Sequence, residues 1–99
     1  MATYQILHWH DIPVQIRALD ASGRVNLPLP PRFQAAIDQA AMEAGLSSDE
    51  AYTALFHWGT ASERPGSARE VAEEVAAEII AQYSVIDWHA TVAQLKNGE

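Results

Sequence analysis

Two short runs near the start of the chain have the residue pattern that is typical of β-strands. Residues 4–9 are rich in aromatic and branched side chains, and apolar and polar residues alternate over 14–18. Alternation at every second position is typical of a strand with one buried side. Pro13 lies between the two runs, and a proline removes a backbone donor and fixes φ. The pattern therefore predicts an antiparallel hairpin that turns around His10–Pro13.

Helical spacing first appears after the prolines near residue 30. Apolar residues then recur at i, i+4, i+7, i+8 and i+11, and they are Phe33, Ile37, Ala40, Ala41 and Ala44. Gly45 follows, and glycine readily takes the left-handed conformation that ends a helix. These positions predict a helix that stops at Gly45.

The strongest helical pattern covers residues 68–83. Small and branched apolar residues line one face and glutamates, including Glu70, Glu73, Glu74 and Glu78, line the other. Ser67 and Glu70 have the spacing of a capping box at its start. An exposed acidic face keeps a helix solvated, so we interpret these glutamates as surface residues and not as catalytic acids.

The remaining segments are shorter. Residues 24–31 contain three prolines and predict a linker. Ser47–Glu50 has capping-box spacing, which predicts the start of a short helix. Residues 55–59 predict a third strand, and residues 63–66 predict a loop. The order predicts an α+β domain over 1–83, with a small antiparallel three-stranded sheet and two main helices packed on one face.

The last segment, 84–99, predicts a tail. Trp88, Val92 and Leu95 are spaced i, i+4 and i+7 after Asp87, a residue suited to cap a helix. This spacing indicates a short amphipathic helix, and a strand over 84–89 is the alternative.

Composition narrows the function. The 99 residues carry a net charge of −7 and no cysteine, which excludes disulfides, thiolate metal sites and a cysteine nucleophile. An acidic domain repels phosphate, so we expect no nucleic-acid or membrane partner.

No signal peptide or membrane-spanning stretch is evident, which favours a cytoplasmic location. No nucleophile elbow or phosphate-binding glycine motif occurs, so we expect a non-enzymatic protein without a cofactor.

The alternative is a metal site at His8, His10 and Asp11. Residues two apart on a strand share a face, so both imidazoles would point at one ion, with His57 or His89 completing the shell. This hypothesis predicts a binder of a divalent metal such as zinc, or a small metal-dependent enzyme. The competing interpretation places His10 and Asp11 at the hairpin turn and His8 within the sheet.

The first strand carries apolar residues on both of its faces. Helices that cover one side of a small sheet would leave the other apolar side for association with another protein or with a second copy. The predicted partner-binding residues are Tyr4, Ile6, Trp9 and Trp58, with Arg17 and Arg32 at a polar rim. A third hypothesis is a ligand-binding regulator with a pocket lined by Tyr52, His57 and Trp58.

Several segments resemble a small bacterial family known as a virulence factor domain. The resemblance rests on Tyr4–Gln15, with the pattern W-[HR]-D-I-P, and on Leu29–Gln34, Ala36–Asp38, Ala40–Met42 and Asp49–Tyr52, where R-F-Q opens a helix. It covers about residues 3–83. The family name implies no chemistry and supplies no catalytic residues. The resemblance implies an accessory subunit or regulator of a methyl-transfer enzyme in folate- and corrinoid-linked one-carbon metabolism.

Overall fold

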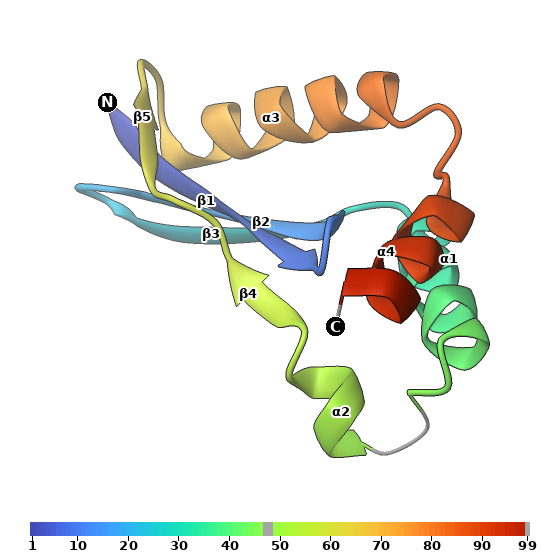
Figure 1. The fold of residues 1–99 in the computed structure, drawn as a ribbon. Coiled ribbons are helices and arrows are strands. Elements are labelled where there is room, and N and C mark those ends of the chain that lie inside the picture. The colour runs from blue at the N-terminus through green and yellow to red at the C-terminus, as the bar shows by residue number, and fades with distance from the viewer. Residues whose placement is uncertain (47–48, 99) are drawn as a thin grey trace.

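The computed structural model describes residues 1–46 and 49–98, with side chains described for 1–46 and 50–96. Within these residues the chain forms one antiparallel sheet of five strands and four helices (Figure 1). The predicted α+β class is confirmed, but the predicted three-stranded sheet is too small. The strand order is β3-β2-β1-β4, and β5 also pairs with β1.

The predicted hairpin forms from β1 (Ala2–Trp9) and β2 (Ile12–Asp20). Ile6 pairs with Ile16, and the register then shifts between Leu7 and His8. Leu7 lies opposite Gln15 whereas His8 lies opposite Pro13, so β2 holds an extra residue there. His10 in the turn has a φ of 55°, the left-handed conformation that a tight reversal requires.

The segment predicted as a proline linker is instead a strand, β3 (Gly23–Pro28), which pairs antiparallel with β2. Its alternation explains this, because Val25 and Leu27 are half-buried against the core whereas Arg24 and Asn26 are exposed. Pro28 is the last residue of an edge strand, where the missing N–H costs little.

β4 (Phe56–Trp58) confirms the predicted third strand, and β5 (Ser62–Arg64) lies where a loop was predicted. They pair with β1 one after the other, β4 near its end and β5 near its start. Arg64 bonds Glu74 and Glu78 at 2.8 and 2.7 Å, and its guanidinium carbon lies 5.4 Å from the Tyr4 ring centroid. These long-range contacts, which local pattern does not reveal, hold a strand of three residues.

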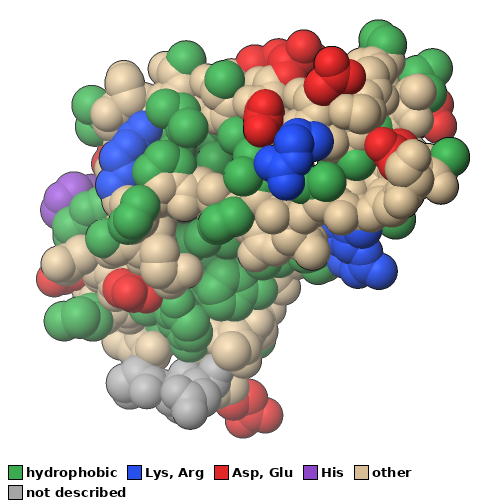
Figure 2. Space-filling model, turned by 180° about the vertical axis from the view of Figure 1, so that it is seen from behind, with side chains coloured by type: hydrophobic (Ala, Val, Ile, Leu, Met, Phe, Trp, Pro, Cys, Tyr) green, Lys and Arg blue, Asp and Glu red, His purple; other side chains and the backbone are tan. Residues whose placement is uncertain are grey.

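α3 (Ala68–Gln82) lies across one face of the sheet (Figure 1). It begins as predicted, because the Ser67 side chain accepts from the Glu70 amide and the Glu70 carboxylate accepts from the Ser67 amide. Acidic side chains gather along the edge that α3 forms in Figure 2. The opposite side of α3 packs on the sheet in a first core cluster, which includes Ile16, Ala18, Phe33, Val71, Ala72, Val75 and Ile79.

α1 (Pro31–Glu43) and α4 (Trp88–Gly98) pack together at the end of the sheet where β1 turns into β2 (Figure 1). The two main helices therefore do not share one sheet face as predicted. A second core cluster forms here, from the buried residues Trp9, Ile12, Ile37, Ala40 and Ala41. It gives the hairpin end its own apolar cover.

The predicted tail helix is α4, and no strand forms over 84–89. The Asp87 carboxylate accepts from the Ala90 amide at 3.2 Å, as expected of a cap. Trp88, Val92 and Leu95 are half-buried against the second cluster. Gly45 ends α1 with a φ of 77°, and α2 (Asp49–Thr53) is the expected short helix, whose predicted cap at residues 47–48 lies outside the described residues.

One carboxylate joins the β2–β3 turn to α3. Asp20 accepts from the backbone amides of Ser22, Gly23 and Ala68 at 2.7, 3.0 and 2.7 Å. The bonds from Ala68 and then Ser22 hold the pKa of Asp20 below its ordinary value. Such a group stabilises the fold fully above its unfolded-state pKa of about 4, and its contribution is lost as the pH falls through the lower folded-state pKa.

We therefore expect Asp20→Asn to weaken the pH dependence of stability below about pH 4. The midpoint of urea unfolding, followed by circular dichroism, should fall less between about pH 5 and pH 3 than in the unmodified chain. A decline remains, because Arg64 also lowers the pKa of Glu78. Glu43→Gln removes the same charge from an exposed position and should leave the slope unchanged; an equal effect of both variants would contradict the assignment.

Candidate functional site

The sheet side opposite α3 is the candidate site. No described helix lies over β2 and β3 on this side (Figure 1). Strand alternation and register place one set of side chains there. We call this set the open face; it consists of Thr3, Gln5, Leu7, Gln15, Arg17, Leu19, Arg24, Asn26, Pro28, Trp58 and Glu63. None of them belongs to either core cluster.

Arg17 and Trp58 form the centre of the open face. The guanidinium carbon of Arg17 lies 4.1 Å from the Trp58 ring centroid, the geometry of a cation–π contact. Arg17 Nη2 donates to Gln5 Oε1 at 2.9 Å, and Gln5 Nε2 donates to the Gly59 carbonyl at 3.0 Å. Side chains from β1 and β4 therefore fix this guanidinium of β2 in place.

The charge of Arg17 is not balanced within the site. The ion pairs of the described residues join Arg64 to Glu74 and Glu78, and Arg69 to Glu73. Arg17 instead bonds a neutral amide and stacks on an indole. A positioned guanidinium keeps further N–H groups for a carboxylate, which it binds in a fork geometry.

The structure separates the residues predicted to bind a partner. Arg17 and Trp58 lie together on the open face. Tyr4 and Ile6 are half-buried on the other side, against the cluster that α3 covers. Periodicity identified both sides of β1 but could not tell which one the chain covers itself.

Trp9 requires a correction, because it is 0% exposed in the second core cluster. Its indole Nε1 donates to the Tyr52 carbonyl at 2.8 Å, so its polar group is used internally. Arg32 lies on α1 and donates to the carbonyls of Ile80 and Tyr83, the last turn of α3. Neither residue belongs to the open face.

The structure does not bring the predicted metal ligands together: no three His, Asp or Glu side chains in the described part of the chain lie close enough to hold an ion. The left-handed His10 interrupts the strand alternation, and its Nε2 lies 3.0 Å from Gln94 Oε1. Asp11 Oδ1 accepts from the Thr91 hydroxyl at 2.6 Å. His10 and Asp11 lie at the hairpin turn, where the competing interpretation placed them, and both bond side chains of α4.

His8 lies apart from them, stacked on His57 with ring centroids 5.6 Å apart. Burial, with a smaller contribution from His57, holds the pKa of His8 below its ordinary value. Its buried Nδ1 has no hydrogen-bond partner among the described residues. Tyr52 belongs to the second cluster whereas Trp58 lies on the open face, so the hypothesis of a pocket shared by Tyr52, His57 and Trp58 gains no support.

Comparison with known families adds one finding. The model of a family described as virulence factor matches residues 7–90. The chain belongs to this family. No curated protein and no solved structure matches the chain.

In this virulence factor domain, the motifs on which the resemblance rests serve packing. In W-H-D-I-P, Trp9 and Ile12 are buried and Asp11 bonds α4. In R-F-Q, Phe33 is 0% exposed and Gln34 donates to the Tyr52 hydroxyl at 2.8 Å. The described side chains of these motifs therefore pack the core and join its elements. The matched segment also contains Arg17 and Trp58.

The helices were compared with the length and hydrophobicity that a membrane span requires. Across the described residues, none is long and apolar enough to span a bilayer.

Proposed function

We propose that this virulence factor domain is a non-enzymatic interaction module, whose open face binds an acidic, partly apolar segment of another protein. The observation that carries the proposal is the Arg17–Trp58 pair, a fixed cation without a carboxylate partner among the described residues. Leu7, half-buried, and Leu19, 41% exposed, add apolar area on the same face. Tryptophan and arginine are the residues that most often anchor protein interfaces.

Charge supports an acidic partner. The charged residues of the open face are Arg17, Arg24 and Glu63, the last of which pairs with Thr3. This gives two positive charges and one negative on a molecule whose net charge is −7. Salt screens charges beyond about 8–10 Å, so this local excess, and not the distant glutamates of α3, acts on a bound segment.

A second copy of the chain fits the face less well. Two copies related by a twofold axis through the open face would bring two Arg17 guanidinium groups toward each other. Like charges across an interface oppose association. We therefore favour a different protein over self-association.

The family resemblance suggests what that protein is. It implies an enzyme of cytoplasmic one-carbon metabolism, to which this domain would attach as an accessory subunit or regulator. The proposed role requires no metal or catalytic group from the chain itself.

The test uses a labelled peptide in which glutamate alternates with leucine, and the same peptide with glutamine for glutamate. Fluorescence anisotropy should detect the acidic peptide only. Arg17→Gln should weaken binding about tenfold or more, because a charge-assisted hydrogen bond contributes roughly 1.5–3 kcal/mol. Arg69→Gln removes the same charge from the exposed face of α3 and should have no effect.

Two outcomes would reject the proposal. The first is equal binding of both peptides, or equal weakening of binding by Arg17→Gln and Arg69→Gln. Either result would show that the open face does not bind carboxylates selectively. Sedimentation that finds a dimer broken by Trp58→Ala would assign the face to a second copy instead.

A further inference from the structure

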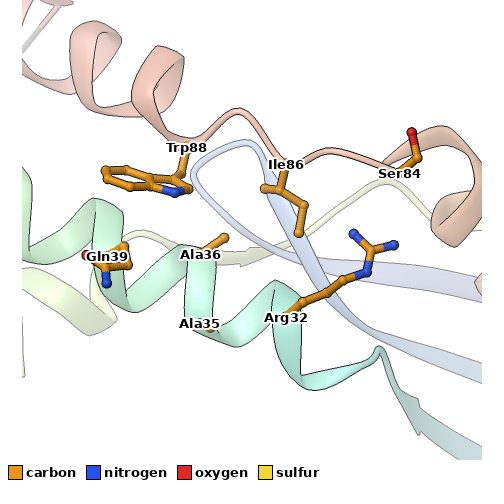
Figure 3. A pocket seen from close by; sticks show the side chains of 7 residues that line it. All are labelled: Arg32, Ala35, Ala36, Gln39, Ser84, Ile86 and Trp88. Carbon is orange, nitrogen blue, oxygen red and sulfur yellow. The ribbon is translucent and has the colours of Figure 1, made fainter.

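A hollow of about 310 Å³ lies between α1 and the segment that joins α3 to α4 (Figure 3). We propose that it binds a small arylcarboxylate, an organic anion with one flat apolar group. The lining residues are Arg32, Ala35, Ala36, Gln39, Ser84, Ile86 and Trp88. The proposal is independent of the open face, with which the hollow shares no residue.

The chemistry of the lining selects an anion. Among the seven described residues of the hollow none is acidic, although the chain holds thirteen Asp and Glu. All four polar side chains can donate hydrogen bonds: a guanidinium, an amide, a hydroxyl and an indole N–H. Asp87 lines a neighbouring hollow that also contains Ile86, and its Oδ1 is occupied by the Ala90 amide.

Arg32 is the anchor for the charge. Its Nη1 donates to the Tyr83 carbonyl and its Nη2 to the Ile80 carbonyl, and its guanidinium carbon lies 4.6 Å from the Phe33 ring centroid. A guanidinium has five N–H groups, so three remain after these two bonds. Both partners are neutral, and no ion pair of the described residues includes Arg32. The cation is thus positioned in advance without being neutralised, which lowers the entropic cost of binding.

The apolar part of the hollow lies beside this anchor. In Figure 3 the guanidinium and Ser84 are at one end, Trp88 and Gln39 are at the other, and Ala36 and Ile86 lie between them. The two alanines leave a shallow floor, and the Trp88 indole, which stacks on the His89 ring with centroids 3.8 Å apart, lies at the apolar end. An anion whose charge meets Arg32 would place its ring toward Trp88.

Size restricts the ligand further. The volume is at the lower end of the range of about 300–1,000 Å³ for ligand pockets. A water molecule occupies about 30 Å³ in the liquid, so the hollow corresponds to roughly ten non-hydrogen atoms. Phenylacetate matches this size. The same chemistry occurs at the C-terminus of a peptide that ends in phenylalanine, so both are tested.

The experiment follows the indole N–H signals of the three tryptophans in ¹⁵N-labelled protein, assigned by Trp→Phe variants. Phenylacetate should shift the Trp88 signal saturably, in the millimolar range expected of so small a ligand. The Trp9 signal should not move, because that indole is buried and bonded to Tyr52. Phenylacetamide, of the same shape without the charge, should shift neither signal. The peptide N-acetyl-Gly-Gly-Phe, compared with its C-terminal amide, shows whether a free acid or a chain end binds better.

Two variants separate the site from the fold. Ala35→Leu fills the hollow from an exposed helical position and leaves the Arg32 contacts intact, and Arg32→Gln removes the charge. Each should weaken phenylacetate binding at least tenfold, whereas Arg24→Gln and Arg17→Gln should not. The proposal would be overturned if phenylacetate did not shift the Trp88 signal, or if phenylacetamide shifted it equally. It would also be overturned if phenylacetate shifted the signal as strongly in Ala35→Leu as in the unmodified chain.

Discussion

Trp9→Ala should lower the free energy of unfolding by about 3–5 kcal/mol, the range measured for large aromatic residues removed from cores. Trp9 is 0% exposed between Ile12, Ile37 and the small residues of α1, so the variant leaves a cavity that this packing cannot close. It also leaves the Tyr52 carbonyl without its indole donor. Urea unfolding followed by circular dichroism measures the change.

Trp58→Ala is the matched control. Trp58 is half-buried on the open face, where it contacts Arg17, and its removal should cost about 1 kcal/mol. We therefore expect Trp9→Ala to lower the free energy of unfolding severely and Trp58→Ala to lower it only slightly. Equal losses would mean that Trp9 is not a core residue and would return it to the predicted binding surface.

Removal of α4, by ending the chain at residue 86, should lower the free energy of unfolding by about 3 kcal/mol. Trp88, Val92 and Leu95 are each half-buried, and a fully buried side chain of this kind contributes about 1.5–3 kcal/mol. The loss also removes the helix that packs against α1 in the second core cluster. Because a domain of this size has a total stability of roughly 5–15 kcal/mol, the shortened chain should unfold at a much lower urea concentration.

Point variants in the full chain distinguish packing from length. Val92→Ala and Leu95→Ala should each reproduce part of the loss, and Lys96→Ala, exposed on the same helix, should be neutral. If the chain ending at residue 86 unfolds like the full chain, then residues 1–83 form the self-sufficient domain that the sequence predicts, and α4 is only an attachment.

Local pattern predicted the elements whose stability is largely local. The hairpin, α1, α3 and α4 each have a periodic apolar face, and Ser67, Asp87 and Gly45 mark their ends by capping or by left-handed φ. The segment Gly23–Pro28 was predicted as part of a linker because of Pro28 itself and the following Pro30 and Pro31, although Arg24 to Leu27 alternate as a strand does. Ser62–Arg64 has no local signal, since its place depends on Arg64 reaching Glu74 and Glu78 on α3.

The candidate site was predicted only in part, for a related reason. Sequence spacing assigns residues to sides of a strand but does not say where each helix lies, so Trp9 and Trp58 looked equivalent. The structure places a helical cover over one and leaves the other beside Arg17. The hollow at Arg32 could not be anticipated, because it joins residues of α1 to a segment about 50 positions later.

The successive pairing of β4 and β5 has a consequence for how the molecule behaves at high concentration. Along its outer edge β1 meets β4 at residues 7–9 and β5 at residues 2–4, and Gln5 uses its side chain to bond Gly59 between them. Free backbone donors and acceptors on a sheet edge invite other chains to add strands and begin aggregates. The exposed edges of the sheet are therefore β3, which ends at a proline, and the three-residue strands β4 and β5. A terminal proline and very short edge strands hinder growth by strand addition, so crowding should favour contacts between side-chain surfaces.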